Sequence, residues 1–306
     1  MYKLGTPPSI SGNISELADF LEAQCLFSDE GIYSLASARS TLSIESDECN
    51  HEGIDSDDDR ILRKLEDALI EIRERRNRTQ NKYPFTIDHS VVKLNIDDGL
   101  IYYIYSYLLL ATRSSMQGKK RYAAGIDGTL LFEELSEIVA KSYFGDNTKS
   151  LIFGTSTTTE TSFNEKVQTL LNSLGEGGVF KNPIGSTGRQ NDGKLDIVVW
   201  KPFQDNRGGQ LIGLGQCKTG TSWRNSIGQL QPSAFFGSYT TCSPYHDPVR
   251  LFFVAESCLE SWEETVRIAG ILFDRCRCMR CFPEDISTDL FERIKIWVDK
   301  KIELLN

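Results

Sequence analysis

The chain has 306 residues, few histidines and no long apolar run, and it has fewer basic than acidic residues. Only His51, His89 and His246 occur, and their spacing fits neither a catalytic triad nor a metal site. The longest apolar run, residues 99–112, is shorter than the roughly 20 residues that span a bilayer. We therefore expect a buried helix there and no membrane association.

Residues 1–13 contain no apolar segment of the kind found in signal peptides, so we expect no signal peptide and a cytoplasmic protein. Eight cysteines occur, but in that compartment a disulfide framework is not expected. Cys276, Cys278 and Cys281 suggest a zinc site that only Cys258 or His246 would complete. The alternative is that these thiols are buried in the core.

The formal net charge is −9. A protein that binds nucleic acid through phosphates alone normally presents a basic surface. This chain would therefore need a local basic groove, a bound metal ion or a protein partner to hold nucleic acid. It contains no GxxxxGK[ST] phosphate loop, so we do not expect it to hydrolyse nucleotides itself.

Residues 1–115 are predicted to form a mostly helical region that precedes a second domain, residues 116–306. Residues 45–59 carry eight acids and no Lys or Arg, which predicts a solvated, mobile loop. The basic stretch 73–78 is interpreted either as a solvated helix end or as a phosphate contact. The elements expected here are helices over 15–27, 60–78 and 98–112 and short strands over 83–87 and 91–94.

The second domain alternates helices and strands, which predicts an α/β fold. Ser261 and Glu264 have the spacing of a capping box, and Pro232 is expected to break or kink the helix that contains it. The expected helices are 129–144, 163–174, 223–239 and 290–302, with a further one starting at the capping box. The expected strands are 179–181, 195–200, 211–218 and 249–255.

The most informative stretch is residues 191–219. Asp196 opens an apolar run, a polar glycine-containing turn follows, and a second apolar run ends in Gln216-Cys217-Lys218. Two adjacent strands joined by that turn would bring Asp196, Gln216 and Lys218 to one sheet edge. An acid, a second oxygen ligand and a lysine around one point are suited to binding a divalent metal and cleaving a phosphodiester.

These residues resemble the core of the PD-(D/E)XK nuclease superfamily, in its Mrr-like branch, where a glycine-rich turn and an aspartate precede a Q-x-K. Asn191-Asp192-Gly193-Lys194-Leu195-Asp196 is similar to the turn and aspartate, and the similarity covers roughly residues 161–256. The resemblance implies a restriction-endonuclease-like core, a central mixed sheet flanked by helices in the order α-β-β-β-α-β. It also implies DNA as the substrate and a role in restriction or anti-phage defence.

The resemblance assigns a role to each residue. Asp196, the side chain of Gln216 and the backbone carbonyl of Cys217 would bind Mg²⁺ or Mn²⁺, and Lys218 would orient the attacking water and stabilise the phosphate. The Cys217 side chain should point into the core because side chains alternate along a strand. The family adds a helix glutamate, for which Glu165 ranks first and Glu133, in a Phe-Glu pair, second.

Asp196 and Lys218 could instead have purely structural roles. Asp196 would then stabilise a turn and Lys218 would face solvent. Gln216 is neutral where an acid is commoner, so a rival hypothesis is a non-catalytic nucleic-acid-binding or scaffold subunit. For an enzyme, the acidic charge and the missing phosphate loop suggest a partner, an ATPase or a sensor subunit, and a homodimer would suit double-strand cutting.

Overall fold

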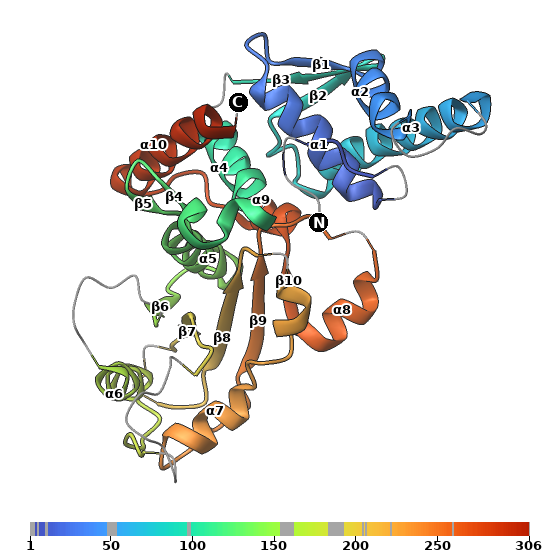
Figure 1. Ribbon diagram of the computed structural model, residues 1–306. Coiled ribbons are helices and arrows are strands. Elements are labelled where there is room, and N and C mark those ends of the chain that lie inside the picture. The colour runs from blue at the N-terminus through green and yellow to red at the C-terminus, as the bar shows by residue number, and fades with distance from the viewer. Residues whose placement is uncertain are drawn as a thin grey trace.

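The computed structural model shows an α/β protein with a mostly helical N-terminal region and a mixed five-stranded sheet in the C-terminal half (Figure 1). It describes residues 4, 6–9, 12–47, 54–96, 99–153, 162–182, 193–203, 205, 207–220, 222–258 and 260–305. Of residues 43–47 and 54–58, only the backbone is described. Within these ranges, no helix is both long enough and apolar enough to cross a membrane.

The N-terminal region packs four helices around a small antiparallel sheet of order β1-β3-β2. The helix α1 begins where the Asn13 side chain accepts a hydrogen bond from the Ser15 amide at 2.7 Å. The predicted helices and short strands of this region are confirmed to within a few residues, except that α3 begins earlier. The elements are α1 (Ile14–Phe27), β1 (Ile32–Ser34), α2 (Leu35–Asp47), α3 (Ile54–Arg78), β2 (Phe85–Asp88), β3 (Val91–Leu94) and α4 (Gly99–Leu110).

The predicted acidic loop over residues 45–59 is wrong wherever the structure describes it. Residues 45–47 end α2, and residues 54–59 form the first turns of α3, while residues 48–53 lie outside the described residues. Aspartates in the first turn of a helix interact favourably with the helix dipole. A run of acids at that position therefore extends α3 instead of preventing it.

The five-stranded sheet has the order β10-β9-β8-β7-β6. β6, β7 and β8 pair in antiparallel fashion, whereas β8, β9 and β10 run parallel. The expected strands 195–200, 211–218 and 249–255 are confirmed. The strands are β6 (Lys149–Ile152), β7 (Ile197–Lys201), β8 (Leu211–Lys218), β9 (Val249–Val254) and β10 (Ile271–Phe273).

Two parts of the strand prediction are wrong. Residues 179–181 are not a strand, because Phe180 forms only a single bridge, with Thr240. The first strand of the sheet is instead β6, a short edge strand that begins Lys149-Ser150 and shows little apolar pattern. Because β6 precedes the helix at 163–174, the observed order of α-helices and strands from residue 128 to residue 254 is α-β-α-β-β-α-β, and this helix is inserted into the expected series.

Helices cover both faces of the sheet. Ile197 and Val199 pack with α5 (Gly128–Phe144) on one face, whereas Val198 and Trp200 pack with α6 (Phe163–Leu174) and α7 (Pro232–Tyr239) on the other. This alternation follows from the two-residue period of a strand. The helices expected at 129–144 and 163–174 are confirmed.

One local prediction near the C-terminal helices is confirmed and one is wrong. The segment 223–239 is helical in part and is broken at Pro232: a short 3-10 turn, η3 (Trp223–Ser226), precedes α7, and Pro232 occupies the first turn of α7. Ser261 precedes α8 (Trp262–Ala269), but its φ of 54° is left-handed and its side chain forms no cap hydrogen bond. The remaining helices are α9 (Arg275–Cys281) and α10 (Thr288–Leu305), and α10 confirms the helix expected at 290–302.

One hydrophobic cluster extends from the N-terminal helices to α10. Trp297 of α10 is fully buried, and its ring lies 5.2 Å from that of Tyr107 in α4. The boundary predicted between residues 115 and 116 therefore separates two regions that share a core.

Buried charges reinforce this junction. The guanidinium groups of Arg75 on α3 and Arg275 on α9 both donate to Asp19 on α1, each at 2.8 Å. Arg75 also contacts Glu22 at 2.8 Å, and the hydroxyl of Tyr105 donates to the same carboxylate at 3.0 Å. Both arginines are fully buried. Three helices that are distant in the sequence are thus joined by paired charges. Breaking these pairs would leave buried charges without a partner, which is strongly destabilising.

Candidate active site at the edge of the sheet

The structure brings Asp196 beside the Gln216-Cys217-Lys218 segment, as predicted. Asp196 lies immediately before β7, and Lys218 is the last residue of β8. Because the two strands are antiparallel, the start of one lies next to the end of the other. The Cys217 amide donates to Asp196 Oδ2 at 2.7 Å, and the Asp196 amide donates to the Gly215 carbonyl at 3.0 Å.

The turn before Asp196 depends on a glycine. Gly193 has a φ of 57°, and a Cβ at this position would lie 3.0 Å from the Phe235 ring and 3.2 Å from the Tyr239 ring. A larger residue would therefore be both strained and crowded. Asn191 and Asp192, the other predicted turn residues, lie outside the described residues.

Gln216 is the most unusual side chain at this edge. The β7–β8 register pairs Ile197 with Gly215, which places Asp196 opposite Gln216. Gln216 is fully buried, and no described residue forms a hydrogen bond with its amide oxygen or nitrogen. An unsatisfied buried polar group costs about 1–3 kcal/mol. This arrangement is consistent with a side chain kept to contact a ligand.

Cys217 lies on the opposite face of β8 and packs against the cluster that contains α5. This confirms the predicted direction of its side chain. Burial raises the pKa of the Cys217 thiol well above its ordinary value, and the nearby Asp196 carboxylate raises it further. The thiol therefore stays protonated at neutral pH and is unsuited to act as a nucleophile.

The two candidate helix glutamates occupy different environments. Glu165 is exposed, and its carboxylate accepts from the Ser162 amide at 2.8 Å and the Ser162 hydroxyl at 2.9 Å in a capping box. These hydrogen bonds lower the pKa of Glu165. Glu133 is half-buried on α5, where its charge contributes to the raised pKa of Cys217. Glu165 is thus engaged at the start of α6, whereas Glu133 lies near the side chain of Cys217.

A second lysine lies close to this edge and was missed in the sequence. The Lys166 ammonium donates to the Phe153 carbonyl at 3.0 Å, and the Phe153 amide donates to the Asp196 carbonyl at 2.7 Å. Lys166 is on α6, one residue after Glu165, and its surroundings depend on the unpredicted strand β6. Helical periodicity alone gave no signal for it.

The cysteine cluster is part of the core. Cys276 and Cys278 are buried in α9, where the Cys276 sulfur lies 3.7 Å from the Ser257 hydroxyl. Burial raises the pKa of Cys276 to about 12. Across the ranges that the structure describes, no three or more His, Cys, Asp or Glu side chains are grouped to hold a metal ion. The buried-thiol alternative is the one that the structure supports.

No family model, curated protein or solved structure matches this chain. The functional argument therefore depends on the geometry of the sheet edge. That geometry combines a carboxylate, a buried amide without a described partner and a strand-end lysine.

Proposed function

We propose that the protein is a metal-dependent endonuclease with a restriction-endonuclease-like core that hydrolyses DNA phosphodiester bonds. The observation that supports this most strongly is the hydrogen bond between Asp196 and the backbone of the Gln216-Cys217-Lys218 segment. The elements α5, β6, β7, β8, α7 and β9, in this order, agree with the α-β-β-β-α-β series that the resemblance implies. In this interpretation α6 is an insertion between the first two strands.

The residues at this edge fit Mg²⁺ or Mn²⁺ by the chemistry of their donors. Asp196, Glu133, the Gln216 amide and the Cys217 carbonyl offer oxygen atoms, which these hard cations prefer, and Mg²⁺ usually keeps several waters. A bound ion would make the attacking water more acidic and would neutralise charge on the phosphate. The buried amide of Gln216 would gain a partner for its oxygen, which no described residue supplies.

The chain's own groups have separate tasks in this proposal. The Cys217 amide fixes one oxygen of Asp196, so the carboxylate is held in place before substrate arrives. Lys218 is half-buried at the end of β8, where its ammonium would orient water and balance charge that develops on the phosphate. Cys217 takes no chemical part beyond its backbone.

The proposed setting is restriction or anti-phage defence, with a protein partner such as an ATPase or sensor subunit. The partner is motivated by the net charge of −9 and by the absence of a phosphate-loop motif. Such a subunit would deliver DNA to an acidic protein and restrain cutting. Robust cleavage by the purified chain alone would count against a required partner.

One observation favours a second candidate, a non-catalytic nuclease-fold subunit that binds nucleic acid or serves as a scaffold. Over the part of the chain that the structure describes, no three acidic, histidine or cysteine side chains gather at a metal-binding point. Gln216 also supplies a neutral ligand where a carboxylate would bind a cation more tightly. The two candidates differ in whether the edge binds a divalent cation.

Cleavage and metal binding together test the proposal. Supercoiled plasmid and single-stranded DNA and RNA are incubated with wild type or Asp196→Asn, in Mg²⁺, Mn²⁺ or EDTA, and Mn²⁺ binding is measured by calorimetry. Asparagine keeps an oxygen that can accept from the Cys217 amide but removes the charge. Metal-dependent DNA cleavage that is lost in the variant supports the enzyme. A wild type that neither binds Mn²⁺ nor cleaves, even with a partner present, supports the scaffold.

A further inference from the structure

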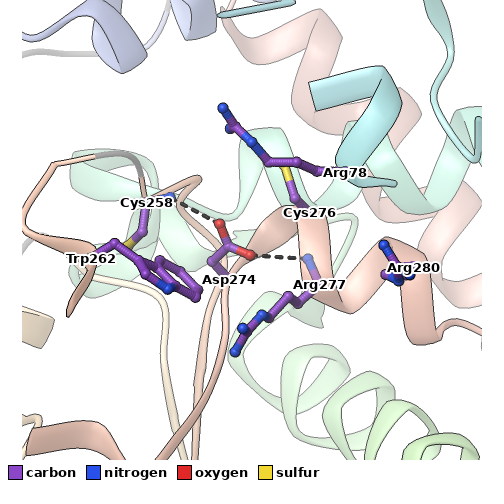
Figure 2. Close-up of a pocket in the computed structure, with 7 residues that line it drawn as sticks. All are labelled: Arg78, Cys258, Trp262, Asp274, Cys276, Arg277 and Arg280. Carbon is purple, nitrogen blue, oxygen red and sulfur yellow. Dashed lines mark hydrogen bonds between the residues drawn. The ribbon is translucent and has the colours of Figure 1, made fainter. Parts of the chain in front are cut away.

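A pocket of about 480 Å³ lies where α3, α8 and α9 meet, separate from the candidate active site. Three arginines line it: Arg78 from the last turn of α3, and Arg277 and Arg280 from α9. Figure 2 shows them around Asp274, with the indole of Trp262 alongside. The remaining lining residues are Cys258 and Cys276. We refer to this site as the arginine pocket.

Two of the three arginines keep their positive charge available. Arg277 donates to the Leu272 carbonyl at 2.9 Å and stacks on Trp262 at 4.5 Å, and neither contact neutralises a guanidinium. Arg280 is exposed and forms no ion pair with any residue that the structure describes. Arg78 is already paired with Glu71, through two hydrogen bonds of 2.9 Å.

The acid in the pocket does not offset these charges fully. Asp274 is buried, and its two oxygens accept from the backbone amides of Cys258 at 3.0 Å and Arg277 at 2.9 Å (Figure 2). The Asp274 charge still acts on Arg277 and Arg78, so three arginines face this carboxylate and that of Glu71, which leaves an excess of positive charge. In a chain of net charge −9, the arginine pocket is therefore a local concentration of positive charge.

The arginine pocket lies at the same edge of the sheet as Lys218. β8, β9 and β10 run parallel, so their carboxyl ends share one edge. Lys218 ends β8 opposite Val254 in β9, and Asp274 directly follows β10. Adjacent strands are about 4.8 Å apart, which places the β10 end about 10 Å from the β8 end.

We propose that the arginine pocket binds successive backbone phosphates of the nucleic-acid strand that is cut beside Lys218, a few nucleotides from the scissile bond. This inference rests on the proposed function. The guanidinium groups of Arg78 and Arg277 lie on opposite sides of Asp274 and do not converge on one point (Figure 2). Such a spread suits successive charges along a polyanion better than a single compact phosphate.

The test is oligonucleotide binding, measured by fluorescence anisotropy over a range of salt concentrations. EDTA is present so that no cleavage occurs. The variants are Arg280→Gln, Arg277→Gln and their double. Arg63→Gln is the control: Arg63 is an exposed arginine on the same helix as Arg78 and lies 15 residues, or about 22 Å, before it. Arg280 has no described ion-pair partner, so its replacement should leave the thermal melt unchanged.

The double variant should bind the oligonucleotide about tenfold more weakly at physiological salt. The slope of the logarithm of its binding constant against the logarithm of salt concentration should also fall by about one for each arginine removed. Arg63→Gln should match wild type. Unchanged affinity and slope in a folded double variant would overturn the proposal.

Inorganic phosphate and ATP serve as competing probes that separate the possible sources of the phosphate. If ATP binds through these arginines while oligonucleotide binding does not need them, the pocket is a nucleotide site, and the proposal that it holds phosphates of the cut strand is wrong. If wild type never cleaves but the double variant loses oligonucleotide binding, the proposed nuclease activity is wrong, while the arginine pocket still binds nucleic acid. If wild type cleaves DNA and the double variant binds the oligonucleotide as well as wild type does, only the role proposed for the arginine pocket is wrong.

Discussion

The carboxylate of Asp196 is held by the backbone amide of Cys217, with 2.7 Å between Oδ2 and the nitrogen. One residue at the start of β7 is therefore tied to the residue between Gln216 and Lys218 at the end of β8. The contact fixes the acid and the Q-x-K segment relative to one another. Predictions about chemistry at this edge depend on it.

Glu133 and Glu165 should differ in their importance for cleavage. Glu133→Gln removes a charge close to Cys217 and should lower the rate of DNA cleavage about tenfold or more. Glu165→Gln should leave the rate unchanged, because glutamine also fits that position of a capping box. Initial rates of plasmid nicking at saturating Mg²⁺ measure both. The opposite ranking would return the helix carboxylate to Glu165.

Cys217 should be chemically inert although it lies in the middle of the motif. Its raised pKa and its packing predict slow reaction with iodoacetamide at pH 8, compared with the exposed Cys242. Mass spectrometry of time points gives the two rates. Cys217→Ala should retain cleavage because the backbone amide remains. Rapid labelling of Cys217, or loss of activity in a folded alanine variant, would show that the thiol has a role.

The core of the candidate site was predictable from the sequence because the signal is local. The apolar runs of β7 and β8 flank a polar turn, so Asp196 had to lie opposite the Gln216-Cys217-Lys218 segment once the two strands paired. Strand β6 was not predicted because it is short and begins with Lys149-Ser150. With β6 missing, α6 took the place of α5 as the first core helix.

The buried charges were not predictable for a different reason. Arg75 belongs to a basic run that resembles a solvated helix end, and its partner Asp19 lies 56 residues away. Arg275 joins the same carboxylate from 256 residues away. Nothing in a local pattern distinguishes an arginine that will be buried by such partners from one that stays in solvent.

Removing one member of this network should destabilise the protein strongly. Arg275→Ala would leave Asp19 and Glu22 with one buried guanidinium fewer, a change that typically costs about 3–5 kcal/mol. Arg63→Ala, on the surface of α3, should change the free energy of unfolding by no more than about 0.5 kcal/mol. Urea unfolding followed by circular dichroism compares the two. Equal stabilities would mean that the paired charges contribute little.

The stability should also fall at acid pH. Burial alone would raise the pKa of Asp19, but the guanidinium groups of Arg275, Arg75 and Arg113 outweigh it and hold this pKa well below its ordinary value of 3.8. A carboxyl with a lowered folded-state pKa contributes stability above pH 3.8, and that stability is lost as the pH falls below it. Asp274 and Glu256, whose pKa values burial raises, act in the opposite direction.

Urea unfolding between pH 7 and pH 3 measures this dependence. The wild type should lose stability below about pH 4, and Asp19→Asn should be less stable at pH 7 with a smaller loss on acidification. An Asp19→Asn variant whose stability depends on pH in the same way as that of wild type would contradict the role given to Asp19.

The most direct test of the central claim compares two lysines of one sheet in a single cleavage assay. Lys218→Ala removes the strand-end lysine at the candidate site, whereas Lys149→Ala removes an exposed lysine of β6. With Mg²⁺ or Mn²⁺ and any required partner present, we predict that plasmid cleavage falls at least about a hundredfold in Lys218→Ala and is unchanged in Lys149→Ala. Equal cleavage by wild type and a folded Lys218→Ala protein would contradict the assignment of the active site.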